Sequence, residues 1–278
     1  MFLDAIKFHE SIFALPFAYI GMTLAADGFP GWATFGWITL AMVSARTVGM
    51  SANRVIDRHI DAINPRAAMR HLPQGLLNAW EVIALAVVSL CIFFFAAWQL
   101  NTLALVLAPV AAVYLVVYPY TKRFTWAANL LLGWALAISP SAAWIGVTGT
   151  LTLEPVLMSL AVALWAGSFD IIYHTQDVEF HRENGLHSVA SRFGVVKAFA
   201  IARTLDISAV ICLVSLGIWM GLSWPYFLSC VAASGILVYK YILVSPSDLS
   251  RLGVAFGRIN AYVSTTMLVG TVWAVYIR

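Results

Sequence analysis

The chain has 278 residues, of which 62% are hydrophobic and 10% are charged, whereas soluble globular proteins average about 45 to 50% and about 25%. A water-soluble domain of this length cannot hide so much apolar surface in one core, so lipid must cover a large share of it. With a mean hydropathy of +0.86 and a formal net charge of only +3, the chain is predicted to be a membrane protein, and no nucleic-acid partner is expected.

Nine apolar stretches are long enough to cross a bilayer, which takes about 20 helical residues. They lie near residues 11–27, 31–52, 80–99, 101–119, 126–148, 155–173, 195–220, 224–244 and 254–276. The predicted fold is therefore an all-α polytopic membrane protein with nine transmembrane helices. All of them belong to one domain, residues 1–278.

The basic residues predict how the chain is oriented. Fifteen of the sixteen Lys and Arg residues fall on one side of these spans, and only Arg278 falls on the other. The positive-inside rule places the basic side, and with it the N terminus, in the cytoplasm. All six histidines and all acids except Asp27 and Glu154 share that side. We therefore expect a multi-pass protein of the cell membrane with its active site at the cytoplasmic face.

A first polar stripe begins in the second predicted span and continues beyond it. Arg46, Asn53, Asp57 and Asp61 follow one another at spacings of seven, four and four residues, so on a helix they share one face. Two carboxylates one turn apart repel each other unless a cation or a bound metal lies between them. The pair predicts a bound cation, and an arginine inside an apolar span is typical of a functional site.

A second polar stripe ends the sixth predicted span. Asp170, Asp177 and His181 are again seven and then four residues apart, with Tyr173 between them. Both stripes leave the membrane on the same side, so we expect them to face each other. Two acid-bearing helix ends suit Mg²⁺, which takes oxygen ligands and shares its shell with substrate phosphates. Zinc is disfavoured because no close His and Cys set is present.

Basic residues accompany these acids, and seven of them are candidates for binding phosphate: Arg46, Arg66, Arg70, Lys122, Arg123, Arg182 and Arg192. An arginine side chain can bind two phosphate oxygens at once through two parallel hydrogen bonds, whereas lysine binds them as a point charge. A metal site beside so many phosphate donors predicts a diphosphate substrate. Lys7, Lys240 and Arg251 are interpreted instead as side chains that snorkel or contact anionic lipid.

Two loops are predicted to cover the site. Residues 64–75 contain Pro65 and Pro73, so they cannot form one continuous helix. A loop rich in arginine over a carboxylate site can close on the diphosphate and exclude water. The segment from Gly185 to Ser188 is interpreted as its counterpart. The two acidic motif regions thus extend over residues 46–75 and 170–192.

These motifs resemble those of the UbiA superfamily of intramembrane prenyltransferases. The family's NxxxDxxxD motif matches Asn53, Asp57 and Asp61, and DxxYxxxD matches Asp170, Tyr173 and Asp177. The resemblance continues through residues 66–75 and 118–123 and covers essentially the whole chain. Residues 7–19 and 173–180 look most like the 4-hydroxybenzoate polyprenyltransferase branch or its relatives in menaquinone synthesis.

The resemblance implies Mg²⁺-dependent transfer of a polyprenyl group from its diphosphate to an aromatic acceptor, in ubiquinone or menaquinone biosynthesis. The implied catalytic residues are Asn53, Asp57, Asp61, Asp170 and Asp177; the substrate-binding residues are Arg46, Arg66, Arg70, Lys122, Arg123, Tyr173 and Arg192; the metal ligands are Asn53, Asp57, Asp61, Asp177 and His181. The implied partners are the two substrates and the bilayer, without an obligate protein partner.

One position departs from the family pattern, which usually has a further Asp four residues after Asp177, where this chain has His181. Neutral histidine can ligate a metal but carries no negative charge. The second ion therefore binds more weakly, or Glu179 or Glu183 replaces the missing carboxylate.

Two other functions compete with prenyl transfer. Intramembrane carboxylates often mark the ion path of a transporter or channel, but transport requires polar groups near the midplane with access from both sides, and these acids cluster at one surface. A phospholipid alcohol transferase also uses Mg²⁺ and embedded Asp motifs, but its compact DxxDGxxAR pattern is not found in this sequence. Prenyl transfer is the favoured hypothesis.

Overall fold

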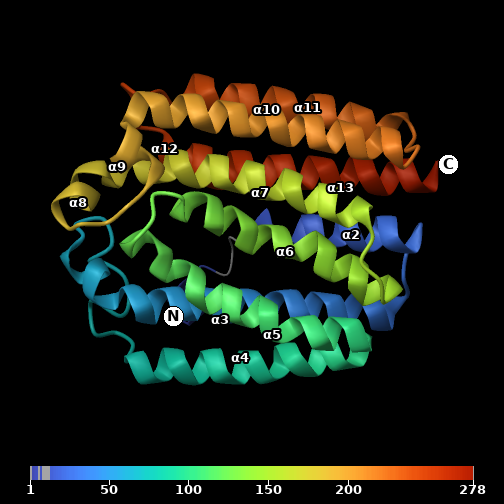
Figure 1. Cartoon of the computed structure of the whole chain (residues 1–278), viewed down its shortest axis with the longest axis horizontal. Coiled ribbons are helices and arrows are strands. Elements are labelled where there is room, and N and C mark those ends of the chain that lie inside the picture. The colour runs from blue at the N-terminus through green and yellow to red at the C-terminus, as the bar shows by residue number, and fades with distance from the viewer. Residues whose placement is uncertain (1, 6, 8–12, 278) are drawn as a thin grey trace.

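A computed structural model of the chain describes residues 2–5, 7 and 13–277, and in that part the regular structure is helical apart from one isolated bridge, Ser245 to Asp248. The long helices run nearly side by side along the longest axis of the molecule (Figure 1). Short elements gather at one end, which we call the cap end: α8 (Val178–Glu183), α9 (Val189–Phe193) and α12 (Leu252–Val254). The loop of residues 64–78, which we call the first cap loop, lies there too.

Within the described residues, every predicted span contains a helix. These helices are α2 (Leu15–Ala26), α3 (Trp32–Ile63), α4 (Ala79–Leu100), α5 (Thr102–Val117), α6 (Ala128–Thr148), α7 (Leu153–Tyr173), α10 (Val195–Trp219), α11 (Trp224–Leu243) and α13 (Asn260–Tyr276). Shorter helical segments lie before or between them: α1 (Phe2–Ala5), η2 (Tyr118–Arg123), η3 (His174–Asp177) and the π-helical η4 (Ala255–Ile259). The start of the first predicted span, residues 11 and 12, lies outside the described residues.

Six of these helices are long and apolar enough to cross a membrane, and α2 is a shorter apolar helix, among the residues that the structure describes. The protein is therefore a multi-pass membrane protein. The six are α4, α5 continued by η2, α6, α7 continued to Glu183, α10 and α11. Helices α3 and α13 are not among the six. Helix α3 contains Arg46 within its apolar part, and α13 has only 17 residues because the π-helical η4 precedes it. The count of nine transmembrane helices stays a prediction.

Local sequence determines where the helices begin and end. Helix α4 starts with a capping box, in which the Glu81 side chain accepts a hydrogen bond from the Asn78 backbone, and α5 starts where the Asn101 side chain accepts one from the Ala104 N–H. Each cap satisfies backbone donors that no helical partner can reach. Helix α3 ends at Asn64 because Pro65 restricts its backbone to an extended conformation.

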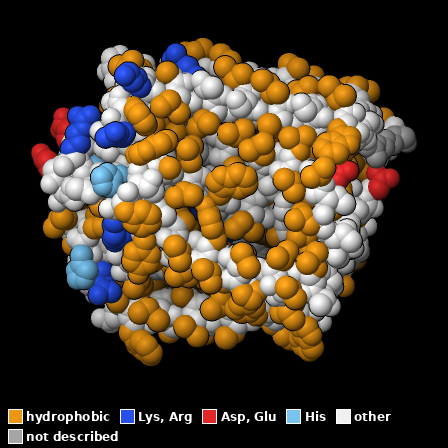
Figure 2. Space-filling view, viewed as in Figure 1, with side chains coloured by type: hydrophobic (Ala, Val, Ile, Leu, Met, Phe, Trp, Pro, Cys, Tyr) orange, Lys and Arg blue, Asp and Glu red, His pale blue; other side chains and the backbone are white. Residues whose placement is uncertain are grey.

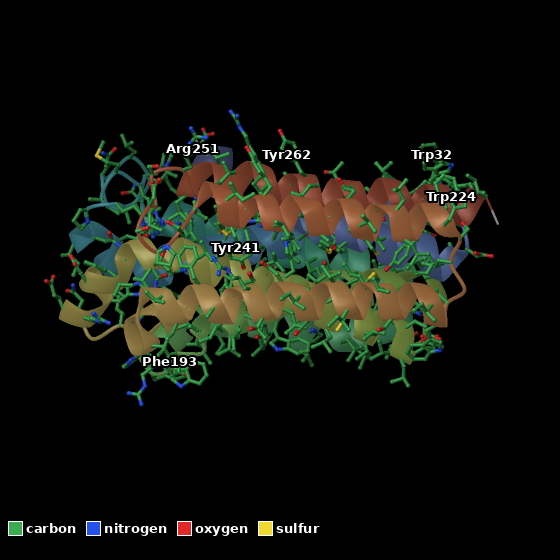
Figure 3. All side chains as sticks on the ribbon, turned by 90° about the horizontal axis from the view of Figure 1, so that it is seen from above. Trp32, Phe193, Trp224, Tyr241, Arg251 and Tyr262 are labelled. Carbon is green, nitrogen blue, oxygen red and sulfur yellow. The ribbon has the colours of Figure 1, made fainter. Side chains whose placement is uncertain are left out.

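The surface agrees with a lipid environment. On the face seen in Figure 2, hydrophobic side chains extend along the bundle, whereas Lys, Arg and His side chains gather at the cap end. Trp32 and Trp224, both exposed, lie at the end opposite to Arg251 (Figure 3). Exposed tryptophans are typical of the membrane–water boundary, so Trp32 and Trp224 mark the edge of the apolar layer away from the cap end.

Candidate active site

Helix α3 carries the first acidic motif to the cap end without a break. Its 32 residues give a length of about 48 Å, which is longer than an apolar layer of about 30 Å and lets it continue into the cap. Asp57 and Asp61 are 1% and 4% exposed. Burying a carboxylate is costly unless it is paired and hydrogen-bonded, so both acids require partners, and the rest of the cap end supplies them.

Asp57 is held by cations from η2, the turn that follows α5. Lys122 Nζ lies 2.5 Å from Asp57 Oδ2, and Arg123 Nη2 lies 3.1 Å from Oδ1. The Asn53 amide donates a further hydrogen bond to Oδ2 at 3.3 Å. Arg123 also ties η2 to α3, since its Nη2 donates to the Ile56 carbonyl at 2.9 Å. Both oxygens of Asp57 are therefore engaged by positive charge.

The first cap loop supplies the partners of the other two acids. Arg66 binds Asp177 with a fork, Nε to Oδ1 at 2.9 Å and Nη2 to Oδ2 at 2.6 Å, and its Nη1 donates to the Tyr173 hydroxyl at 2.8 Å. Arg70 Nη1 lies 2.6 Å from Asp61 Oδ2. Burial opposes the charge of Arg66, but the hydrogen bonds and the charge of Asp177 outweigh it and raise the pKa of the guanidinium. The two acidic motifs thus lie around one loop.

Asp170 belongs to a different group of side chains, deeper than Asp177. Asn129 Nδ2, at the start of α6, donates to Asp170 Oδ2 at 2.7 Å, and His174 Nδ1 lies 3.2 Å from the same oxygen. The side-chain oxygen Asn129 Oδ1 accepts from the Val189 N–H at 3.1 Å. A single buried amide therefore joins α6, α7 and the second cap segment, residues 184–193. Sequence reasoning missed Asn129, although a lone amide inside an apolar stretch was a signal.

Helices α6 and α7 must approach closely for this contact to form. A Cβ added at Gly133 would lie 2.3 Å from the Ala163 carbonyl oxygen and 2.9 Å from the Gly167 amide nitrogen. Small residues allow helix backbones to meet in membranes. Asn129 lies one turn before Gly133, so the same close packing brings its amide to Asp170.

Replacement of Asn129 by leucine should lower the free energy of unfolding by about 1–3 kcal/mol, because the Val189 N–H would be left buried without its partner and Asp170 Oδ2 would keep only His174. Thermal unfolding of the purified protein in detergent measures the effect. Asn184→Leu is the matched control, since Asn184 is exposed on the cap and should change stability by less than about 0.5 kcal/mol. Equal unfolding temperatures for the two variants would contradict the role of Asn129.

Three further residues singled out in the sequence take no direct part in these ion pairs: His181, Glu179 and Arg192. His181 is buried, with its Nδ1 3.3 Å from Ser188 Oγ and its ring stacked on His174 at a centroid distance of 5.7 Å. Glu179 and Glu183, the possible substitutes for a carboxylate, are both exposed. Arg192 is exposed on α9, and the structure does not bring it to the acids.

One interpretation of the sequence is wrong. Lys240 was expected to snorkel toward lipid headgroups, but it is 1% exposed and its Nζ lies 2.6 Å from Asp206 Oδ2 on α10. The Tyr241 hydroxyl donates to the same oxygen at 2.6 Å, and Tyr241 lies inside the bundle (Figure 3). A lysine on α11 snorkels only when its helix face meets lipid, and this face meets α10 and α7, where Ser168 Oγ accepts from Nζ at 3.3 Å.

A large apolar cavity lies inside the bundle. Its volume is about 590 Å³, and along α3 its lining runs from Met50 to Ile38, which corresponds to about 18 Å. Arg46 and Asp170 are the two charged residues that line it, among the described residues, and Tyr118 lies with them. Arg46 is two helical turns from Asn53 and donates through Nη2 to the Lys7 carbonyl at 3.2 Å. The cavity therefore joins a charged end to a long apolar interior.

The donor set suits Mg²⁺ shared with a phosphate ligand. Over residues 2–5, 7 and 13–277, no three His, Cys, Asp or Glu side chains are grouped closely enough to hold a metal by themselves. Mg²⁺ is usually bound by one or two carboxylates and completes its shell with phosphate oxygens and water. Buried Asp57, Asp61 and Asp177, with the Asn53 amide, supply oxygen donors of that kind.

Comparison with known proteins identifies the family. The model of the UbiA prenyltransferase family matches residues 14–268. A 4-hydroxybenzoate octaprenyltransferase of Cupriavidus necator is 33% identical over 259 residues, covering 92% of this chain and 90% of its own length. One of Escherichia fergusonii is 31% identical over 238 residues, covering 84% and 81%.

Solved structures show the same fold. The apo structure of a UbiA homologue from Aeropyrum pernix has a TM-score of 0.86 at 29% identity and covers 94% of this chain and 96% of its own. A UbiA homologue from Archaeoglobus fulgidus bound to DMAPP and Mg²⁺ has a TM-score of 0.69 at 17% identity and covers 96% and 98%; at that identity it supports the fold alone. The chain belongs to the UbiA prenyltransferase family.

Proposed function

We propose that this protein transfers a polyprenyl group from polyprenyl diphosphate to an aromatic acceptor that carries a carboxylate, such as 4-hydroxybenzoate or a related quinone precursor, with Mg²⁺. The observation that carries the proposal is the set of paired acids and bases at the cap end, together with a long apolar cavity that Arg46 and Asp170 line. The relatives named 4-hydroxybenzoate octaprenyltransferase support the aromatic acceptor. The proposed active site faces the cytoplasm, where the positive-inside rule places the cap end.

The cationic side chains of the cap end suit a diphosphate. Arg66, Arg70, Lys122 and Arg123 lie around the acids, and arginine and lysine bind phosphate oxygens strongly. Their charge stabilises the negative charge that develops on the leaving diphosphate as the allylic C–O bond breaks. Mg²⁺, held by Asp57, Asp61 and Asp177 with Asn53, would supply further positive charge to the same phosphate oxygens.

The cavity suits the apolar part of the reaction. An aromatic carbon of the acceptor attacks the allylic cation, and a base or the leaving diphosphate removes the ring proton. The long interior of the cavity accommodates the isoprenoid chain, and the cap loops keep water from the cation. Arg46 is the cation that lines this cavity, among the described residues, so we assign it to the carboxylate of the acceptor.

Arg46→Gln should therefore raise the KM for 4-hydroxybenzoate by about 10- to 100-fold, the value of a hydrogen bond to a charged group, and leave the KM for prenyl diphosphate nearly unchanged. Steady-state kinetics with each substrate varied in turn measures both. Arg251→Gln, at an exposed arginine, is the matched control. An equal rise in both KM values would assign Arg46 to the diphosphate or to general stability instead.

The direct test of the function is transfer of a radiolabelled prenyl chain by the purified protein. The acceptor panel includes 4-hydroxybenzoate and naphthoate compounds, each with and without Mg²⁺. The expected result is a Mg²⁺-dependent product with one acceptor. If folded protein yields no product with any acceptor, the proposed substrates are wrong.

A further inference from the structure

Three acids of the two acidic motifs are already paired with basic residues from other segments. Asp57 is paired with Lys122 and Arg123, Asp61 with Arg70, and Asp177 with Arg66. Asp57 and Asp177 have both carboxylate oxygens engaged. In this arrangement the acids serve as partners of arginine and lysine rather than as open metal ligands.

These pairs conflict with a metal ion on the same oxygens. Mg²⁺ would bind a carboxylate oxygen at about 2.0–2.1 Å, while the nitrogens now on those oxygens lie at 2.5 to 3.1 Å. The ion and the protein cation would then be a few ångströms apart and repel each other in a partly desolvated site. A metal therefore binds these carboxylates more favourably when the basic side chains move to another partner.

The charge of the site points to that partner. The three carboxylates and the four basic side chains carry one net positive charge. Adding a divalent ion alone raises the charge to three positive, whereas a diphosphate, with about three negative charges near neutral pH, brings the combination close to zero. Metal and diphosphate together fit the site better than either alone.

The relative exposure of the arginines and the acids also suits an exchange of partners. The side chains of Arg66 and Arg70 are 27% and 24% exposed, whereas those of Asp177 and Asp61 beneath them are 3% and 6% exposed. An arriving phosphate therefore meets the guanidinium groups before it meets the acids. Both arginines belong to the first cap loop, which turns and bends rather than forming a continuous helix, so they can change partners without moving α3.

We propose that Arg66 and Arg70 act as a gate for the metal, so that divalent ions bind the buried carboxylates tightly only when a diphosphate takes over the two guanidinium groups. The inference rests on the proposed function, because it assumes that the same acids hold the metal. It makes the site selective for a metal–diphosphate pair and excludes free divalent ions from the empty enzyme.

The test is equilibrium dialysis of Mn²⁺ against the purified protein in detergent, with and without inorganic diphosphate, compared at equal free Mn²⁺. For the unmodified protein, diphosphate should raise the apparent Mn²⁺ affinity by at least about tenfold, within the usual range of coupling between two ligands. Arg66→Gln and Arg70→Gln should each bind Mn²⁺ alone more tightly than the unmodified protein and lose most of the gain from diphosphate. Arg251→Gln should behave as the unmodified protein does.

The sign of the variant effect is the decisive result, because an arginine that only binds phosphate would leave the affinity for Mn²⁺ alone unchanged. Equal Mn²⁺ binding with and without diphosphate in the unmodified protein would overturn the gate. This comparison uses only the unmodified protein, so it does not depend on how well the variants fold. If Mn²⁺ binds alone and prenyl transfer still occurs, the gate fails and the proposed function stands. If the variants change Mn²⁺ binding as expected but no acceptor is prenylated, the gate stands and the proposed function fails.

Discussion

Asp57→Asn and Asp177→Asn should each reduce prenyl transfer by at least about 100-fold, the usual effect of removing one group that stabilises charge in a transition state, while the protein stays in the membrane. Asparagine keeps the shape of the side chain but removes the negative charge that Lys122 and Arg123, or Arg66, now neutralise. Initial rates in isolated membranes, normalised to the amount of protein by immunoblot, measure the effect.

The control for this prediction is Asp248→Asn, because Asp248 is exposed and bonded only within its own turn through Ser250, Ser245 and the backbone. Its rate should match that of the unmodified protein. Near-normal activity in both Asp57→Asn and Asp177→Asn would remove the acidic motifs from the mechanism and, with them, the proposed role of Mg²⁺.

Lys240→Met should destabilise the protein by about 3–5 kcal/mol, the usual cost of leaving one charge of a buried pair without its partner. Asp206 would keep only the Tyr241 hydroxyl, since its Oδ1 already lacks a hydrogen-bond partner in the described structure. Thermal unfolding in detergent checks the result, with Lys197→Met at an exposed lysine as the matched control.

The double variant Asp206→Asn with Lys240→Met separates two explanations of that loss. If the destabilisation comes from an uncompensated charge, removing both charges should restore most of the stability, as is common for buried ion pairs replaced together. If the double variant is as unstable as the single one, the loss comes from the packing of Lys240 against α7 and α10 rather than from its charge.

The acidic motifs could be predicted because their spacing depends only on the period of a helix. Asn53, Asp57 and Asp61 share one face of α3 whatever α3 packs against. The cap loop followed with equal directness from Pro65, which ends the helix. Six membrane helices were evident from composition, whereas α3 and α13 mix polar residues into their apolar lengths, so hydropathy alone identifies them less clearly.

Contacts between helices could not be predicted in the same way. Asn129 reaches Asp170 because Gly133 lets α6 approach α7, and Lys240 reaches Asp206 because of how α11 is rotated against α10. One sequence specifies neither the rotation of a helix nor its neighbour. For Lys240 the sequence gives the helical period of α11 and the charge of the side chain, but not which face of α11 meets lipid.

The pair of Arg66 and Asp177 also bears on how the protein is made. The two residues are 111 positions apart, so at about 5–20 residues per second the ribosome completes Arg66 roughly 6–22 s before Asp177. In that interval, on the proposed orientation, the arginine is free to act as one of the charges that retain the end of α3 on the cytoplasmic side. Once Asp177 is in place, the same charge is withdrawn into an ion pair. Part of the positive charge that guides insertion into the membrane is thus neutralised in the folded enzyme.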